Sequence, residues 1–336
     1  MLCTNGPRKT TTGKRKISEP FQSPKAPNAE PYDNLKFKSA FHQARYMELV
    51  EEMLWYEQVF NLSPEGAYNH IYQLFAKQEW GRLLQPPKKV NVELVREFYT
   101  NALPTLSTNP FTFQTFVRGR DISFTRDAIN EYLVNPYHLA ERDELCEFHA
   151  TLAQGSFNYS EIERTIVKSG RHYDVSDAGR KHRAKYVDLT LPAQVILKLI
   201  LHNIRPKSHI LTTTVDVAAL IYYILKGKKV DIARTITYDM KLVTLHGKST
   251  KKCPLAFPGL IMGLIIATRM YLAPAIHEEI KIPIDDEFIS RNMEKKKKKD
   301  KGSRASTSQN PQPQQEPPQV PTTQAFDFLT FVPWMN

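Results

Sequence analysis

Cysteine is scarce in this chain, which contains only Cys3, Cys146 and Cys253, spread far apart among 336 residues. So few cysteines exclude a zinc knuckle and are typical of a reducing compartment. Glycine is also scarce, and no glycine-rich phosphate cradle is present. The longest apolar run, 255–268, is shorter than the roughly 20 residues that span a bilayer, so we interpret it as a buried helix. We expect no membrane partner and no cofactor.

Positive charge is plentiful, but it lies at the two ends of the chain. The net charge is +11; residues 1–40 hold eight basic and three acidic residues, and residues 291–304 hold eight and two. Both ends are rich in polar residues and proline, and such segments bury too little apolar surface to offset the entropy lost on ordering. We expect a disordered basic tail at 1–40, a globular domain at 41–290, and a disordered tail at 291–336 that is Lys-rich and then Pro/Gln-rich.

The spacing of apolar residues in the globular part is mostly helical. It predicts a mainly α fold, a single helical domain with one small β-hairpin at 111–124. The expected helices include 41–60, 64–80, 145–154, 190–204, 232–245 and 255–268. Ser63-Pro64 marks the start of 64–80, and Asp231 that of 232–245. Further helices are expected after the caps Asn91, Thr125 and Thr213, and at the capping box 160–163.

Four ordered segments together resemble a known family. They are Trp80–Pro87 with Asn91–Tyr99, Val117–Phe124 leading into Asn130, His202–His209 with Ala219–Lys228, and Leu255–Ile261. Their order and spacing over about 66–290 resemble the plant transposon protein domain. The resemblance implies an origin in a plant retroelement or transposon reading frame, and it implies no particular activity. The segment 155–188 departs from the family pattern.

Two groups of cations are candidate contacts for nucleic acid. The segment 168–185 contains Arg171, Arg180, Lys181 and Arg183, with His172, Tyr173 and Tyr186 interleaved. Cations beside aromatic rings suit phosphate contact and base stacking, although a solvated basic loop has the same composition. Arg118 and Arg120 flank a predicted turn, where two guanidinium groups could hold a phosphate or simply face solvent.

Further features lie in the two ends. Two clusters of basic residues resemble nuclear import signals, although solubilising charge explains them too. They are Lys14, Arg15, Lys16 and Lys295, Lys296, Lys297, Lys298, Lys299. They favour the nucleus over the cytoplasm. The terminal segment Phe326–Trp334 is apolar. It would dock onto a partner or onto the chain's own core, or it is a remnant of a decayed reading frame.

No catalytic residue and no metal-ligand set can be assigned from the sequence. Asp285-Asp286 reads as a solvated acidic turn, and His202 and His209 lack a third ligand at a suitable spacing. The favoured hypothesis is a non-catalytic helical module that binds DNA, RNA or a protein. A metal-dependent transposase or nuclease is the alternative, and it requires three carboxylates within about 4–6 Å of one point. A third possibility is an unselected element fragment without a cellular role.

Overall fold

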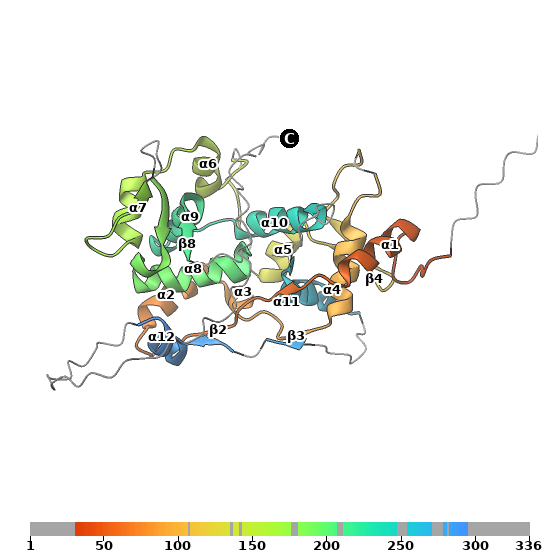
Figure 1. Ribbon diagram of the computed structural model, residues 1–336, viewed down its shortest axis with the longest axis horizontal. Coiled ribbons are helices and arrows are strands. Elements are labelled where there is room, and N and C mark those ends of the chain that lie inside the picture. The colour runs from red at the N-terminus through yellow and green to blue at the C-terminus, as the bar shows by residue number, and fades with distance from the viewer. Residues whose placement is uncertain are drawn as a thin grey trace, which may run out of the picture. The chain divides into compact units, whose positions relative to one another are not determined.

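The structure, a computed structural model, describes residues 31–106, 108–134, 137–140, 143–175, 181–206, 211–246, 254–270, 278–280 and 282–294, with the backbone alone for 181, 182 and 246. Twelve α-helices lie within these residues, so the prediction of a mainly α fold is confirmed (Figure 1). The helices are α1 (Ala40–Leu49), α2 (Asn69–Gln78), α3 (Gly81–Leu84), α4 (Val92–Ala102), α5 (Arg126–Leu133), α6 (Glu147–Gln154), α7 (Tyr159–Ile166), α8 (Leu191–Leu199), α9 (Val215–Leu225), α10 (Ile232–His246), α11 (Pro258–Ala267) and α12 (Asp286–Asn292), with a 3₁₀ turn η1 (Tyr186–Asp188) and a π-helical turn η2 (Ile200–Ile204).

The strands are short and form five small sheets within the described residues. They are β1 (Leu54–Trp55), β2 (Phe60–Asn61), β3 (Lys89–Val90), β4 (Gln114–Val117), β5 (Arg120–Ser123), β6 (Asp174–Val175), β7 (Lys181–Lys185), β8 (Thr212–Thr214), β9 (Leu255–Ala256), β10 (Glu278–Glu279) and β11 (Ile284–Asp285). The antiparallel pair β4–β5 is the predicted hairpin. The other sheets are additions to the predicted fold.

Three of these sheets join the first part of the domain to the last. β1 pairs in parallel with β9, β2 in parallel with β11, and β3 antiparallel with β10. The predicted helix 41–60 is therefore wrong in its second half, because α1 ends at Leu49 and Phe60 lies in a strand. Aromatic residues suit a half-buried strand, and their local spacing does not reveal that Trp55 pairs with Ala256.

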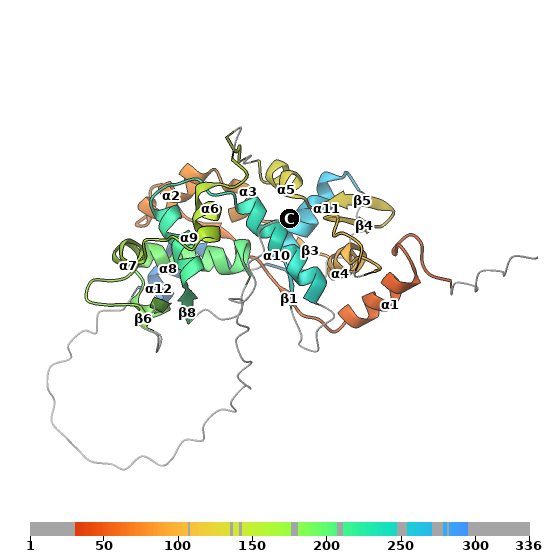
Figure 2. The ribbon, with the colours of Figure 1, turned by 90° about the horizontal axis from the view of Figure 1, so that it is seen from above.

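Helix α4 forms where the sequence predicts it. The Asn91 side-chain oxygen accepts a hydrogen bond from the Leu94 N–H at 3.2 Å, which satisfies one of the free donors of the first turn. The helix packs against α1, α11 and the hairpin β4–β5, and these elements gather on one side in Figure 2. Its buried face includes Phe98 and Tyr99, which are core residues as expected.

A second group of elements is built around the sheet β6–β7–β8, in which β7 is antiparallel to both neighbours. Helix α9 packs against this sheet and against α7 and α8 (Figure 2). The predicted helix 190–204 is confirmed as α8 continued by η2, with Pro192 in its first turn. Helix α11 confirms the predicted buried helix, and its residues from Pro258 to Ile265 are all buried.

Several predicted helix starts are misplaced. Thr213 lies in β8, so that Thr214 precedes α9, and residues 255 and 256 form β9, so that α11 begins at Pro258. Helix α2 begins at Asn69 because Ser63 takes part in a turn, where its N–H donates to Asp286 Oδ2 at 2.9 Å. With Ser160 as its N-cap, helix α7 would begin at Glu161. It begins at Tyr159 instead, because the Asn158 side chain is the cap and accepts a hydrogen bond from the Glu161 N–H. Both asparagine and serine are good N-caps, so their close succession left the choice to tertiary packing.

The described part of the chain begins within the predicted N-terminal tail. Phe37 is buried, and the Lys38 N–H donates to Asn101 Oδ1 at 3.0 Å, so this segment is attached to α4. The rest of both predicted tails, residues 1–30 and 295–336, lies outside the described residues. Among the helices described, none combines the length and the apolar character that a bilayer crossing requires.

Candidate functional site

The basic segment 168–185 contributes the central and one outer strand of the sheet β6–β7–β8. The strand register sets Asp174 opposite Arg183, and Lys185 Nζ lies 3.4 Å from Asp174 Oδ1. Arg171 Nε lies 3.5 Å from Asp188 Oδ1. Arg180 lies outside the described residues, and only the backbone of Lys181 is described. Arg183 and Lys185 therefore lie on the sheet next to Asp174, whereas Lys168 and Arg171 lie before the sheet and contact residues 187–188.

The aromatic residues of this segment have different environments. Tyr173 is 6% exposed, so its ring belongs to the core and cannot stack on a base at the surface. His172 is exposed, and its Nδ1 lies 2.7 Å from Glu163 Oε1. Tyr186 is half-buried. Base stacking by this segment would therefore involve His172 or Tyr186.

The hairpin cations Arg118 and Arg120 are also differently placed. Arg118 and Gly119 form the turn with positive φ angles of 46° and 80°, as a tight two-residue hairpin requires. Arg118 Nε lies 2.7 Å from Glu97 Oε1, and its Nη2 lies 3.2 Å from Glu93 Oε2. The Glu97 side chain is 1% exposed, and burial raises its pKa to about 7 against the opposing effect of Arg118. Arg118 thus compensates a buried carboxylate, whereas Arg120 is exposed.

A second buried carboxylate, that of Glu57, holds the start of α11. Its two oxygens accept the backbone N–H groups of Gly259 at 2.9 Å and Leu260 at 2.8 Å. These donors are free in the first turn of a helix, whose dipole also favours a negative charge there. Burial nevertheless raises the pKa of Glu57 to about 7, with the backbone hydrogen bonds acting in the opposite direction.

Asn203 fixes the chain next to Glu57. Its Oδ1 accepts the Gln58 N–H at 2.9 Å, and its Nδ2 donates to Gln58 O and to Leu83 O, both at 2.8 Å. Asn203 is 2% exposed, so these backbone groups would otherwise lack a partner in the interior. One side chain therefore joins η2, the segment after β1, and α3.

Arg82 and Tyr132 complete this junction. Arg82 Nη1 donates to the Tyr132 carbonyl, and its guanidinium carbon lies 5.2 Å from the centre of the Tyr132 ring. The cavity between these residues, Glu57 and Asn203 measures about 10 Å³, room for one water molecule at most. Glu57 is enclosed at this junction, and the hydrogen bonds described above give it a structural role at the start of α11.

A cysteine–histidine pair, which the sequence analysis did not identify, lies at the start of α6. Cys146 Sγ is 3.0 Å from His149 Nδ1, and His149 Nε2 is 3.1 Å from Thr235 Oγ1. Burial raises the pKa of Cys146 and lowers that of His149 to about 3. Both groups are thus neutral near pH 7, whereas nucleophilic catalysis needs a thiolate. The spacing Cys-x-x-His was visible in the sequence, but its third partner comes from α10.

The described residues contain no group of three or more His, Cys, Asp or Glu side chains placed to hold a metal ion. The carboxylate cluster that the transposase or nuclease alternative requires is therefore not found among them. Asp285 instead caps α12, because its Oδ1 accepts the Phe288 N–H at 2.7 Å. The lysine and arginine clusters at 14–16 and 295–299 lie outside the described residues.

The segments that meet around Glu57 and Asn203 are those that carry the family resemblance: Trp80–Pro87, His202–Arg205 and Leu255–Ile261. The chain matches the family described as "Putative plant retrotransposon-related domain" over residues 76–270, more than half its length. It belongs to this family of plant retrotransposon-related domains. No curated protein and no solved structure matches the chain significantly.

Proposed function

We propose that this retrotransposon-related protein is a non-catalytic helical module that binds nucleic acid through a cationic strand surface. We define this surface as Lys168, Arg171, Arg183 and Lys185. The observation that carries the proposal is a pair of contacts that brings Lys168 and Arg171 to the chain just after Lys185. Lys168 Nζ donates to Val187 O at 2.6 Å, and Arg171 Nε lies 3.5 Å from Asp188 Oδ1. A concentrated cluster of lysine and arginine is what a phosphate backbone attracts.

The ion pairs of this surface are compatible with ligand binding. The side chains of Arg171 and Lys185 are 63% and 57% exposed, and their carboxylate partners lie 3.5 and 3.4 Å away. The Lys185–Asp174 pair is exposed on both sides, and such pairs contribute only about 0–1 kcal/mol, so a phosphate can replace the Asp174 carboxylate at little cost. The segment 168–185 also carries six Lys or Arg against two Asp, an excess that the pairs do not neutralise.

The proposal is tested by fluorescence anisotropy with a labelled DNA duplex and a single-stranded RNA, using the full chain over a range of salt. Binding should weaken as salt rises, and Arg171→Ala with Lys185→Ala should reduce the salt slope by about two. The matched control is Lys228→Ala with Lys229→Ala, which removes the same charge from two exposed ion pairs elsewhere. Equal binding by both double variants, or no binding by the wild-type chain, contradicts the proposal.

A further inference from the structure

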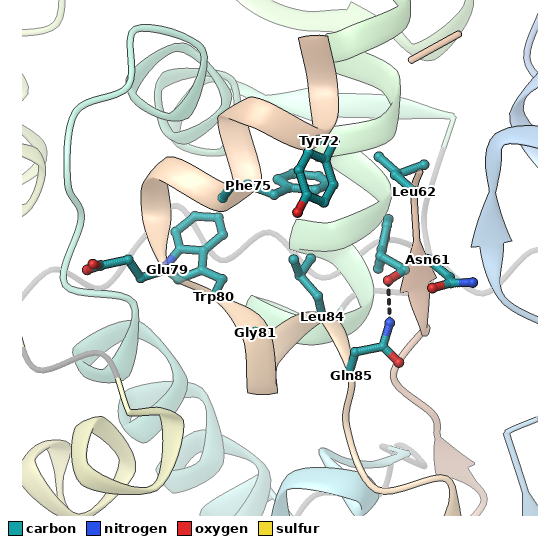
Figure 3. A pocket seen from close by; sticks show the side chains of 11 residues that line it. Asn61, Leu62, Tyr72, Phe75, Glu79, Trp80, Gly81, Leu84 and Gln85 are labelled. Atoms are coloured by element: carbon teal, nitrogen blue, oxygen red, sulfur yellow. Dashed lines mark hydrogen bonds between the residues drawn. The ribbon is translucent and has the colours of Figure 1, made fainter. Parts of the chain in front are cut away.

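An apolar cavity of about 330 Å³ opens between β2, α2 and α3 (Figure 3). Its lining is Phe60, Asn61, Leu62, Tyr72, Phe75, Ala76, Glu79, Trp80, Gly81, Leu84 and Gln85. The rings of Phe60 and Phe75 meet edge to face at 5.9 Å, and Gln85 Nε2 donates to Phe60 O. The polar ends of Glu79 and Asn61 point away from the space in Figure 3, which leaves a mostly hydrocarbon wall. A space of this size and polarity suits a large aromatic side chain.

The chain leaves the described part of the domain beside this cavity. Strand β11 pairs with β2, which forms one wall, and α12 follows directly. Glu294, the last residue described before the C-terminal segment, lies near the hydroxyl of Tyr68, because burial and then the Glu294 carboxylate raise the pKa of Tyr68. Tyr68 precedes Tyr72 by one turn, since the Tyr72 N–H donates to Tyr68 O at 3.1 Å. The described chain therefore ends, at Glu294, next to the wall that α2 contributes.

The end of the chain has the composition that the cavity would accept. Residues 326–334 include five large apolar side chains: Phe326, Phe328, Leu329, Phe331 and Trp334. They follow 31 residues, 295–325, which contain no large hydrophobic residue except Val320. A flexible linker of that length has a root-mean-square span of about 30 Å, ample for a return to a site beside its own origin.

We propose that residues 326–334 fold back and place an aromatic side chain in the cavity of the same chain. Attachment through a short linker gives the segment an effective concentration in the millimolar range. A second copy of the chain, at micromolar concentration, would compete poorly for the same space. The terminal segment thus acts as an internal ligand of the face formed by β2, α2 and α3, independently of nucleic-acid binding.

Photo-crosslinking in the full-length chain tests this proposal. We would place p-benzoyl-phenylalanine at Phe328, irradiate, separate single-chain from two-chain products, and map the adducts by mass spectrometry. We expect adducts within one chain, on residues 60–85. The same probe at Thr322, in the linker, sets the background.

Two substitutions on α2 provide the matched pair. Ala76 is exposed and lines the cavity, whereas Gln73 is exposed on the same helix outside the lining. Ala76→Arg should lower the adduct yield about tenfold, because a guanidinium at the mouth disfavours an apolar occupant, and Gln73→Arg should leave it unchanged. Should Ala76→Arg impair folding, Phe331→Ser with Trp334→Ser removes the apolar side chains without touching the domain and should lower the yield as well.

Three results would overturn the proposal. Adducts that join two chains would assign the cavity to a second copy. Adducts elsewhere, or at the yield seen from position 322, would show that the segment does not occupy the cavity. Adducts on residues 60–85 that persist in both the Ala76→Arg and the Phe331→Ser/Trp334→Ser variants would show that contact there does not depend on the apolar fit.

Discussion

Glu57 and Gly259 are 202 residues apart in the chain, yet Glu57 Oε2 accepts the Gly259 N–H at 2.9 Å. The approach is tight, since a Cβ atom at Gly259 would lie 3.1 Å from the Pro86 Cβ and 3.2 Å from Glu57 Oε2. The first turn of α11 is therefore held between a buried carboxylate and the Pro86-Pro87 segment. This junction connects three of the four segments that identify the family.

Replacing Glu57 should change how stability depends on pH. Its pKa is about 7 in the folded chain, against an ordinary glutamate value of 4.5, so the folded state binds more protons between these limits. The contribution of Glu57 to stability therefore falls as pH rises from 4.5 to 7. Glu57→Gln removes this fall, so its stability relative to wild type should rise over that window by up to about 3 kcal/mol. Urea unfolding at a series of pH values measures the difference, and a constant offset across the window contradicts the assignment.

His149 should produce a pH dependence of opposite sign. Burial lowers its pKa to about 3 from 6.5, so between these values the unfolded state binds the extra proton. Stability from this group is complete above pH 6.5 and is lost as pH falls toward 3. His149→Leu should remove this loss of stability at acid pH, which amounts to about 5 kcal/mol at most. A control is His70→Leu, at an exposed histidine of α2, which should leave this loss of stability in place.

Removing Arg118 should destabilise the fold. Its partner Glu97 is 1% exposed, and without Arg118 it would either remain an unpaired buried charge or take up a proton, and both cost folding free energy. We expect Arg118→Ala to lower the free energy of unfolding by about 2 kcal/mol, less than for a fully buried pair because Arg118 itself is partly exposed. The double variant Arg118→Ala with Glu97→Gln should recover at least half of the loss. Arg120→Ala is the matched control and should change stability little, since that side chain is exposed. Equal stability of Arg118→Ala and wild type would show that the pair does not matter.

Asn203 should be among the residues most sensitive to truncation. Asn203→Ala leaves the Gln58 N–H and O and the Leu83 O without their buried partner. Each such loss costs about 1 kcal/mol or more, so we expect a decrease of about 3 kcal/mol in urea unfolding. Asn292→Ala removes an exposed hydrogen bond to Phe288 O and should cost less than about 0.5 kcal/mol. Similar losses in the two variants would show that the buried hydrogen bonds of Asn203 stabilise the fold no more than one exposed hydrogen bond does.

The positions of helices were predictable where the signal lies in neighbouring residues. The caps Asn91, Thr125 and Asp231 each satisfy a backbone N–H three residues ahead, as their positions before apolar periodic segments indicated. The hairpin β4–β5 was predictable for the same reason, because its turn joins adjacent segments. Predictions failed where two local signals competed, as between Asn158 and Ser160, or where aromatic residues such as Phe60 suited helix and strand alike.

In the candidate sites, too, the local sequence signal was predictable and the tertiary environment was not. The sequence identified the cations of 168–185 and of the hairpin turn, but it could not distinguish Arg171, paired with a partly exposed carboxylate, from Arg118, paired with a buried one. Burial depends on what packs above a residue, and those residues come from other parts of the chain. Glu57 gave no signal, since its partner Leu260 is 203 residues away in the chain. The spacing of Cys146 and His149 was visible in the sequence, but their burial and the third partner Thr235 were not.

Composition and periodicity were sufficient for the helical class and the placement of most helices, and the family was visible through its resemblance to four ordered segments of the sequence. The tertiary structure alone decided which strands pair, which carboxylates are buried and where an apolar cavity opens. The physical reason is that caps and amphipathic faces arise from neighbours within one or two turns. By contrast, the bonds from Glu57 to α11 and from Asn203 to Gln58 exist only after segments more than a hundred residues apart have packed together.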